Sequence, residues 1–439
     1  MIPILTTEAM RDADATAVSL RGTDALVAAA GTAVALCAQT MLRGCYGRRV
    51  GVVAGPGLNG ADGRVAAAWL HGRGALVHVV EWDHAPALLD GYDLVIDAAF
   101  GLGCSRPYDA PRVSANTLVL AVDLPSGVDS DTGALLGAPL SANATIALGA
   151  FKPAHFTGPA ADLCGTLHFA GLGIVDTFED GLVTDEDLSS LVNSARSDHK
   201  WDHALQALVG STLMPGAAEL VLRGALAGGA SMIRFESRGD VASSVELPPE
   251  VVHTPDPRID PRCRAVVAGP GLGPDAATWL RARLNDCPCP VVLDADGLDR
   301  GLIDDLAPND GSWVLTPHEG EFARLTGAPH GPDRFAAVRA LASDTGCVVL
   351  LKGPRTVIAS PAGRIRVVTS GTSALATAGT GDVLSGLLGA TIARGHDPLE
   401  AAALAAHFHG RAGSHLSAYS SASDVVTEVR QLIRTLAFS

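Results

Sequence analysis

The sequence predicts an α/β protein of two domains, each a doubly wound, three-layer sheet. Short apolar runs rich in β-branched residues alternate with segments of helical pattern along most of the chain, as in successive strand–helix–strand units. Several runs end in a glycine turn or an aspartate, which is where ligands bind in open parallel sheets. The chain has 439 residues, too many for one compact core, and 47% of them are apolar.

The first half of the chain contains the first series of strands. Residues 48–54 form a β-branched run that stops at Gly55-Pro56-Gly57, as a buried strand entering a glycine loop does. A helical segment is expected over 62–72. Further strands are expected at 75–80, 93–97 and 118–122. Asp97 ends one of these strands and Asp123 follows another, so both carboxylates should lie at one rim of the sheet.

An acidic, serine-containing segment from about Asp176 to Asp198 separates the two halves. We place the boundary there and expect domains at 1–190 and 191–439. The second half repeats the alternation, with strands near 265–268, 291–294, 313–315, 347–351 and 364–368 and helices at 382–393 and from Pro398 to about Leu416. The strand ends carry Asp294, Asp296, His318, Glu319 and Lys352.

The composition limits the partners and the compartment. A formal net charge of −15 argues against nonspecific binding to nucleic acid or an anionic membrane. We expect no apolar run of the roughly 18 residues that cross a membrane, and the N-terminus lacks a signal-peptide pattern. Eight cysteines are scattered, and only Cys287 and Cys289 lie close together, without a partner at zinc spacing. We therefore expect a cytoplasmic protein with reduced thiols.

Lysine is rare in this chain. Of 32 basic residues only three are lysines: Lys152, Lys200 and Lys352. Arginine does not replace lysine where a compact ammonium must approach a phosphate or a carbonyl. The three lysines are either chance survivors or positions that need a point charge, and we adopt the second interpretation.

The run Gly379-Thr-Gly-Asp-Val-Leu-Ser-Gly386 is the strongest candidate site. Glycines ahead of a helix leave N–H groups free for an anion, which the helix dipole also favours. Asp382 is either a charge cap or a general base, and the three close glycines favour a base, because a cap does not need them. The run resembles the Gly-x-Gly-Asp motif of the ribokinase superfamily. There the glycine amides hold the transferring phosphate and the aspartate deprotonates the attacking hydroxyl.

Four further motifs of the second half are Gly269-Pro-Gly-Leu-Gly273, Val292-Leu-Asp-Ala-Asp-Gly-Leu298, Leu315-Thr-Pro-His-Glu-Gly-Glu321 and Leu351-Lys-Gly-Pro-Arg-Thr356. In this order they are similar to the ADP- or ATP-dependent NAD(P)H-hydrate dehydratases, which have a ribokinase-like fold. The resemblance implies nucleotide contacts by Lys352, Gly353, Pro354, Arg355, Thr356, Gly379 and Gly381. It implies substrate contacts by Ala217, His318 and Asp382, and by Gly271 or Gly273. Taken alone, His318 would be a turn residue and Asp294 a strand-end cap, but their placement at one rim favours a site.

The first half resembles another family, the NAD(P)H-hydrate epimerases, with a Rossmann-like fold. The similar motifs are Gly55-Pro-Gly-Leu-Asn-Gly-Ala-Asp-Gly63, Asp93-Leu-Val-Ile-Asp-Ala-Ala-Phe-Gly-Leu-Gly103, Val122-Asp-Leu-Pro-Ser-Gly-Val-Asp129 and Gly149-Ala-Phe-Lys-Pro153. The resemblance implies a potassium ion at Asn59, Asp97 and Ser126, whose hard oxygen atoms suit a weakly held cation. It implies substrate contacts by Asn59, Asp62, Asp123 and the segment from Gly101 to Pro107. Asp123 is our candidate acid–base group.

The chain departs from both families at a few positions. Leu58 and Ala61 stand where the epimerase loop has an asparagine and a glycine. The dehydratase half opens with His199-Lys-Trp201 in place of His-Lys-Gly, and a later Gly-Gly is Val209-Gly210. Asp382 and its glycines match the motif, so the departures concern the substrate fit and the epimerase loop rather than the predicted base.

A reduced nicotinamide cofactor can add water across a ring double bond, and the hydrate has two epimers at the hydroxyl-bearing carbon. We expect the first domain to interconvert the epimers of NADHX and NADPHX, and the second to dehydrate one epimer with ADP or ATP and Mg²⁺. The alternatives are a ribokinase-superfamily kinase of small molecules and a non-catalytic, ligand-binding N-terminal domain. We also expect a homo-oligomer that binds neither nucleic acid nor membranes.

Overall fold

The computed structural model describes residues 1–175, 177–192, 199–254 and 256–438. The chain divides into two compact units. The N-terminal unit comprises Ile2–Asp180 and Pro332–Arg334, and the C-terminal unit comprises Met1, Gly181–Gly331 and the chain from Phe335 onward. The division at residue 180 lies about ten residues before the boundary placed at 190 from the sequence.

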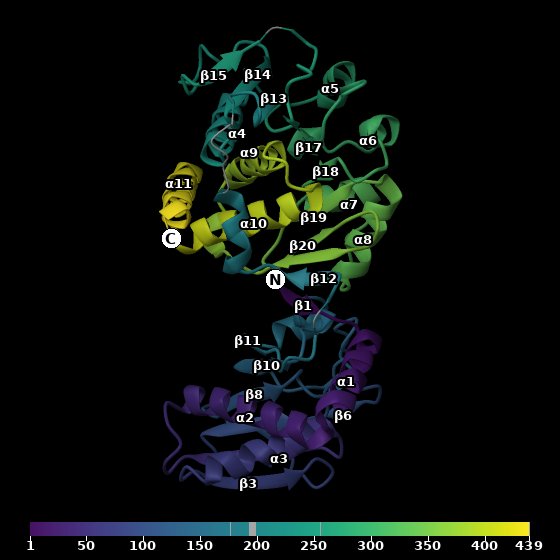
Figure 1. Ribbon diagram of the computed structural model, residues 1–439, viewed down its shortest axis with the longest axis vertical. Coiled ribbons are helices and arrows are strands. Elements are labelled where there is room, and N and C mark those ends of the chain that lie inside the picture. Colours follow the sequence, from purple (N-terminus) through teal and green to yellow (C-terminus); the bar gives the residue numbers. More distant parts are fainter. Residues whose placement is uncertain (176, 193–198, 255, 439) are drawn as a thin grey trace. The chain divides into compact units, whose positions relative to one another are not determined.

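The sheet of the N-terminal unit has six parallel strands (Figure 1). They are β2 (Arg49–Ala54), β3 (Leu76–Glu81), β5 (Leu94–Ala98), β8 (Leu118–Val122), β10 (Ala144–Leu148) and β11 (Thr166–Ala170). Their order is β11-β10-β8-β5-β2-β3, and every neighbouring pair is parallel. The four strands predicted in this half are therefore confirmed. Because β5 and β8 are neighbours, Asp97 and Asp123 lie at the same edge.

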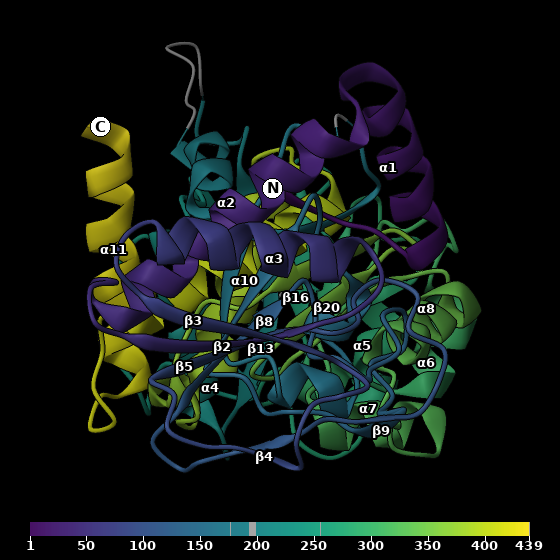
Figure 2. The ribbon, with the colours of Figure 1, turned by 90° about the horizontal axis from the view of Figure 1, so that it is seen from below.

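Different elements cover the two faces of this sheet. The helices are α1 (Thr7–Arg21), α2 (Thr23–Leu42) and α3 (Leu58–His71). α2 and α3 lie side by side on one face (Figure 2), where Val34 and Ala66 share a core with Val52. On the other face Val53 and Val95 pack with side chains from the short strands β4 (Leu88–Leu89), β6 (Tyr108–Asp109) and β7 (Arg112–Val113).

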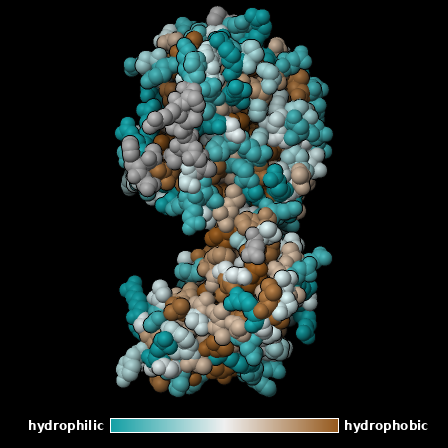
Figure 3. All heavy atoms as spheres, viewed as in Figure 1, coloured by the Kyte–Doolittle hydropathy of each residue, from teal (hydrophilic) through white to brown (hydrophobic). Residues whose placement is uncertain are grey.

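Helix α2 contradicts one expectation. Its 20 residues are apolar enough to cross a membrane by length and composition, although we expected no such run. The expectation failed because Ala, Gly, Thr and Gln interrupt the strongly apolar residues without adding a charge. In the structure Val34 and Leu42 are buried in the core that α2 shares with the sheet and α3, and Leu26 is buried at the wall of a cavity. On the face seen in Figure 3, apolar side chains reach the surface of the N-terminal unit. Leu20 and Leu36 are among the exposed apolar residues of this unit.

Helix α3 starts four residues before the predicted segment, at Leu58, so part of the expected glycine loop is helical. Glycine normally disfavours a helix, but here two glycines permit close packing. A Cβ on Gly60 would lie 1.9 Å from the carbonyl oxygen of Gly55, and one on Gly63 would lie 2.6 Å from Ala98 Cβ. The close approach, which the sequence pattern does not show, brings the first turn of α3 onto the strand ends.

The C-terminal unit contains a larger, mixed sheet. Its strands are β12 (Asp180–Leu182), β13 (Ala204–Ser211), β14 (Met232–Arg238), β15 (Val251–His253), β16 (Ala265–Ala268), β17 (Val291–Leu293), β18 (Val314–Leu315), β19 (Val348–Leu351), β20 (Thr356–Ala359) and β21 (Ile365–Val368). Their order is β12-β21-β20-β19-β18-β17-β16-β13-β14-β15. β20 is antiparallel to both neighbours, and the other pairs are parallel. The five strands predicted in this half are thus confirmed.

Helices flank this sheet on both sides (Figure 1). α4 (Pro215–Ala227), α9 (Thr380–Ala393), α10 (Pro398–Ser414) and α11 (Ala422–Phe438) pack with the strands in one large core. α5 (Ala276–Leu284), α6 (Arg300–Leu306), α7 (Glu319–Thr326) and α8 (Arg334–Thr345) lie on the other side. α9 and α10 match the two helices predicted in this half to within about two residues.

Candidate functional sites

The glycines of the run Gly379–Gly386 lie at the start of α9. Gly379 precedes the helix with φ of +89°, a conformation that side chains disfavour. A Cβ on Gly381 would lie 3.7 Å from Lys352 Nζ and 4.0 Å from Asp294 Oδ2. The first amides of α9 are therefore close to a lysine ammonium, which is the arrangement that an anion-binding site needs.

Lys352 and Asp294 follow strands β19 and β17 and form an ion pair of 2.8 Å between Nζ and Oδ1. Ser385 of α9 donates a hydrogen bond of 2.6 Å to Asp294 Oδ2. Burial opposes ionisation of Asp294, but Lys352 and these hydrogen bonds hold its pKa below the ordinary value. The carboxylate is ionised at neutral pH and holds the ammonium at the strand ends.

Asp382 lies in the first turn of α9, beside this pair. Burial and the like charge of Asp294 raise the pKa of Asp382 to about 7, and Lys352 opposes the shift only in part. A carboxyl group with a pKa near neutrality can take up and release a proton under working conditions. The role of Asp382 as the base stays a prediction, and its surroundings are those that such a base requires.

His318 is the N-cap residue of α7. Its Nδ1 accepts hydrogen bonds from the backbone N–H groups of Gly320 and Glu321, and Glu321 accepts one in return from the His318 N–H. Glu321 Oε2 lies 3.7 Å from Lys352 Nζ. The cap thus has a structural role, as His318 would have if taken alone, and it also joins His318 to the site through Glu321.

Three predicted substrate contacts meet at the Gly269–Gly273 turn. A Cβ on Gly271 would lie 2.6 Å from the Cβ of Ala217, so these two residues are in contact. The N–H of Gly273 donates a hydrogen bond of 2.9 Å to Asp296 Oδ2. Asp296 in turn contributes to the raised pKa of Asp382. The turn is therefore an extension of the same site.

The predicted nucleotide segment Lys352–Thr356 forms the turn between the antiparallel strands β19 and β20. Gly353 and Pro354 are exposed, whereas Arg355 and Thr356 are half-buried. Thr356 Oγ1 donates a hydrogen bond of 3.2 Å to the carbonyl oxygen of Gly353, which closes the turn. An exposed turn that begins at Lys352 is open to a ligand.

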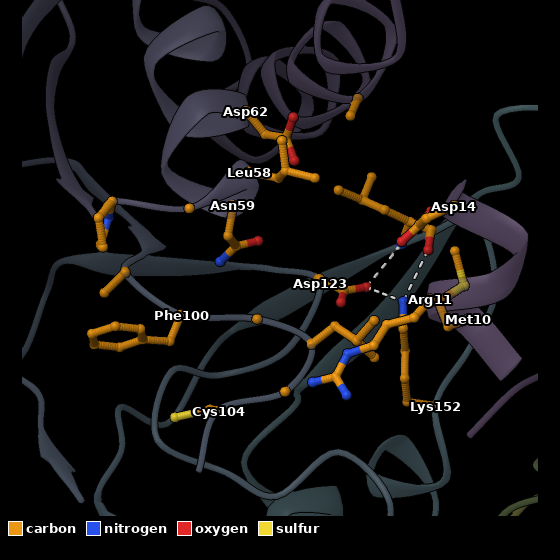
Figure 4. A pocket seen from close by; sticks show the side chains of 18 of the residues that line it. Met10, Arg11, Asp14, Leu58, Asn59, Asp62, Phe100, Cys104, Asp123 and Lys152 are labelled. Carbon is orange, nitrogen blue, oxygen red and sulfur yellow. Dashed lines mark hydrogen bonds and ion pairs between the residues drawn. The ribbon is translucent and has the colours of Figure 1, made fainter. Parts of the chain in front are cut away.

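The N-terminal unit contains a cavity of about 590 Å³ (Figure 4), within the usual range of small-molecule sites. Its walls come from α1, α3 and the segments that follow β5, β8 and β10. The predicted substrate residues that line it are Asn59, Asp62, Gly101, Pro107 and Asp123. Sequence reasoning missed Met10, Arg11 and Asp14 of α1, because no strand end or glycine turn marks them.

Lys152 and Asp123 form a buried ion pair in the wall of this cavity. Lys152 Nζ donates to Asp123 Oδ1 and to the carbonyl oxygens of Leu148, at 2.9 Å, and Ala150, at 3.0 Å. Asp123 has φ of +64°, and His155 Nε2 lies 2.7 Å from its carbonyl oxygen. These contacts hold the lysine in place, and the strained backbone marks Asp123 as a functional candidate.

Two more carboxyl groups face the same cavity, Asp62 from α3 and Asp14 from α1. Burial, together with the charges of Asp123 and Asp14, raises the pKa of Asp62 to about 8. Burial also raises the pKa of Asp14, against the opposing effect of Lys152. The site therefore combines a group that is protonated at neutral pH with a carboxylate that is paired with lysine.

The predicted potassium ligands lie around the segment after β5. Ser126 donates to Asp97 from its backbone N–H, at 2.8 Å, and from Oγ, at 2.6 Å, and it also bonds the backbone of Phe100. Burial raises the pKa of Asp97, and none of the ion pairs of the described residues includes it. A Cβ on Gly101 would lie 3.0 Å from Asn59 Oδ1, which places the amide near this segment.

These residues fit a cation in part. A buried carboxylate without a positive partner favours a bound cation, and the amide of Asn59 has a buried, unpartnered Nδ2. Exchanging its oxygen and nitrogen would present an unengaged oxygen instead. No cluster of three or more His, Cys, Asp or Glu side chains with metal-binding geometry occurs among the described residues. That statement does not cover the amide oxygen of Asn59 or the hydroxyl oxygen of Ser126, which are two of the three predicted potassium ligands.

The departures from the family motifs have local explanations. Ala61 lies inside α3, where the helix needs no positive φ, and Leu58 lines the cavity. Trp201 stacks under the Arg262 guanidinium, 3.5 Å from it. Lys200 is exposed, and its carbonyl oxygen accepts a hydrogen bond from Ser231. The structure thus supports a point-charge role for Lys152 and Lys352 and gives Lys200 no charged partner among the described residues.

Comparison with known proteins bears on both units. The NAD(P)H-hydrate dehydratase family matches residues 205–435, and the YjeF-related protein N-terminus family matches residues 23–90 and 81–154. The bifunctional NAD(P)H-hydrate repair enzyme of Mycobacterium tuberculosis is 39% identical over 80% of this chain and 79% of its own length. The chain belongs to the bifunctional NAD(P)H-hydrate repair enzymes.

Other repair enzymes of this family are also similar to the chain over most of its length. The repair enzyme of Mycobacterium leprae is 37% identical over 86% of each chain, and that of Escherichia coli is 33% identical over 80% of this chain and 72% of its own. The ADP/ATP-dependent NAD(P)H-hydrate dehydratase of Bacillus subtilis, co-crystallised with ATP and Mg²⁺, matches with a TM-score of 0.51 and 27% identity. It covers 58% of this chain and 97% of that one. A ribokinase-like superfamily protein of Enterococcus faecalis matches with a TM-score of 0.51 and 19% identity over 60% of this chain, so the ribokinase-like fold is confirmed. The repair-enzyme relatives do not favour the kinase alternative.

Proposed function

We propose that this repair enzyme restores hydrated nicotinamide cofactors in two steps, one in each unit. The N-terminal unit interconverts the R and S epimers of NAD(P)HX, and the C-terminal unit dehydrates the S epimer to NAD(P)H with ADP or ATP. The observation that carries the dehydratase step is the position of Asp382. Its pKa of about 7 allows it to take up or release a proton near neutral pH, and it lies in the first turn of α9 beside the Lys352–Asp294 pair.

In the dehydratase, Asp382 would remove the proton from the substrate hydroxyl, whose oxygen then attacks the terminal phosphoryl group of the nucleotide. The amides of Gly379–Gly381 and the Lys352 ammonium would hold the negative phosphoryl oxygens. The phosphorylated oxygen then leaves with its electron pair, the ring nitrogen supplies electrons, and loss of a neighbouring proton restores the double bond. Hydroxide is a poor leaving group, and the phosphorylation removes that difficulty.

Mg²⁺ bound with the nucleotide would neutralise phosphate charge during this transfer. Carboxylate oxygens are its preferred protein ligands, and Asp294 and Glu321 supply them beside Lys352. Gly271, Gly273, Ala217 and His318 would contact the nicotinamide substrate, and the turn at 352–356 would contact the nucleotide.

In the epimerase, Asp123 would act as an acid–base group at the hydroxyl-bearing carbon, with the substrate held by Asn59, Asp62 and the segment from Gly101 to Pro107. A potassium ion at Asn59, Asp97 and Ser126 would supply positive charge to the buried Asp97. We further propose that the enzyme works in the cytoplasm, self-associates and binds neither nucleic acid nor membranes. The free state of all eight cysteines is compatible with a reducing compartment.

The deciding experiment gives the whole protein an epimer mixture of NADHX with either ADP or ATP and follows NADH absorbance. Full recovery of NADH requires both activities, and recovery of one epimer alone requires only the dehydratase. Asp382→Asn removes the base but keeps the shape, so we expect recovery to fall by ~10³-fold or more. Asp344→Asn, at an exposed position on α8, serves as the control. Unchanged recovery in Asp382→Asn would refute the role of Asp382.

A further inference from the structure

Three carboxyl groups share the N-terminal cavity with one buried ammonium. Asp14 comes from α1, Asp62 from α3 and Asp123 from the end of β8, and all line the cavity with Lys152 (Figure 4). Lys152 is only 1% exposed and bonds Asp123 and two backbone carbonyls. These contacts hold the ammonium beside Asp123, and its charge also acts on Asp14, whose pKa it lowers against the effect of burial.

The other charged groups at the cavity include two arginines, Arg11 and Arg106, and neither is among the causes of the pKa shifts of Asp14 and Asp62. The Arg11 guanidinium lies against Gly103. Tyr108 also lines the cavity, and burial raises the pKa of its phenol, so it carries no charge at neutral pH. His155, which bonds the Asp123 backbone, has a pKa lowered to about 4 by burial, so it is neutral as well. Of the Asp14 and Asp62 carboxyl groups, therefore, only Asp14 has a cation among the causes of its pKa shift.

We infer that Asp14 is a positioning residue of the epimerase, whose negative charge keeps a proton on Asp62 so that Asp62 acts as the acid opposite the base Asp123. This inference rests on the proposed epimerase function. Asp123 accepts the hydroxyl proton as the hydroxyl oxygen forms a carbonyl group and the bond from that carbon to the ring nitrogen breaks. Asp62 gives its proton to the nitrogen that leaves. When the bond forms again on the other face, both protons return, so no proton is gained or lost per turnover.

The distribution of charge supports this assignment. Asp62 faces the negative charges of both Asp123 and Asp14, and both raise its pKa in addition to burial. Asp14 faces Lys152, whose charge favours the ionised form of Asp14. Asp62 has no such cation among the causes of its shift. The proton therefore belongs on Asp62, and Asp14 acts through it rather than on the substrate.

The test is the pH profile of epimerisation in the full-length protein, measured as the epimer ratio of NADHX without nucleotide. Asp14→Asn removes a negative charge beside Asp62, so Asp62 should lose its proton at lower pH. We expect the alkaline limb of the profile, near pH 8 in the unchanged protein, to move to lower pH. The rate at pH 8 should fall by ~10-fold, since the acid is then mostly deprotonated. Asp14→Glu keeps the charge and should restore the limb.

Asp12→Asn is the matched control, because Asp12 is an exposed residue of the same helix. It should leave both the rate and the limb unchanged. A lower rate in Asp14→Asn with an unmoved alkaline limb would show a merely structural role and overturn the inference, as would a shift in the Asp12→Asn control. If the unchanged protein does not alter the epimer ratio, the epimerase function itself fails.

Discussion

Both units place a lysine–aspartate ion pair at the carboxyl ends of parallel strands, yet the two lysines are held differently. Lys152 is 1% exposed, and two backbone carbonyls bond it in addition to Asp123. Lys352 is 21% exposed beside Asp294 and faces the helix amides of α9. The same pair is thus a fixed part of a cavity wall in one unit, and a charge that a ligand phosphate can reach in the other.

The largest expected effect of this difference is on stability. Lys152→Met leaves Asp123 as a buried charge without a partner, so we expect the N-terminal unit to lose about 3–5 kcal/mol of unfolding free energy. Denaturant unfolding of the full-length protein measures the loss, and hydrogen exchange in peptides from β5 and β8 assigns it to this unit.

Lys200→Met is the matched control, because Lys200 is exposed, and it should change the unfolding free energy by less than about 0.5 kcal/mol. Equal effects of the two substitutions would mean that Lys152 does not stabilise the cavity wall. The two lysines would then not differ in their contribution to the stability of their units.

In the C-terminal unit, one substitution should lower the activity without lowering the stability, and its effect is smaller than that of Lys152→Met. An added Cβ in Gly381→Ala would lie 3.7 Å from Lys352 Nζ, an ordinary contact that the folded protein accommodates. It would nevertheless occupy the space in which a phosphate reaches the helix amides. We expect dehydration to slow by ~10²-fold, with the unfolding free energy unchanged or raised by up to about 1 kcal/mol.

Thermal unfolding and the rate of NADH recovery test this prediction together. Gly301→Ala is the control, because Gly301 also lies in the first turn of a helix and has ordinary space for a Cβ. It should leave the rate of NADH recovery unchanged, and any change in the unfolding free energy should have the same direction and range as in Gly381→Ala, up to about 1 kcal/mol. Loss of stability in Gly381→Ala would indicate that this glycine serves packing rather than access for phosphate.

Strands and glycine turns were predictable from the sequence, because buried parallel strands and strand-end ligands leave local patterns. Asp382 and Lys352 were found for this reason, as were Asp97 and Asp123. Asp14 was not predictable, since a single aspartate on an amphipathic helix looks like any exposed residue until the helix covers a cavity. The start of α3 was missed for a related reason. The close contact between Gly60 and Gly55, rather than helix propensity, decides where this helix begins.

The additional carboxyl group beside each ion pair gives a second contrast between the two units. Burial is the main cause that raises the pKa of Asp62 to about 8 and that of Asp382 to about 7. Their proposed roles are opposite, since Asp62 must carry a proton to act as an acid and Asp382 must lose one to act as a base. The same physical cause therefore predicts opposite pH dependences in one polypeptide.

The smallest expected effect follows from these pKa values. Dehydration should slow by about tenfold per pH unit below pH 7, as Asp382 becomes protonated, whereas epimerisation should slow above pH 8, as Asp62 loses its proton. Because the folded pKa of Asp382 exceeds its ordinary value of 3.8, its contribution to stability is fully present below about pH 4 and is lost as pH rises from there through about 7. Asp382→Asn should accordingly gain stability relative to the unchanged protein as pH rises from about 4 to 7, and the difference should be constant above pH 7. Parallel pH profiles of the two activities would contradict the assignment of one acid and one base.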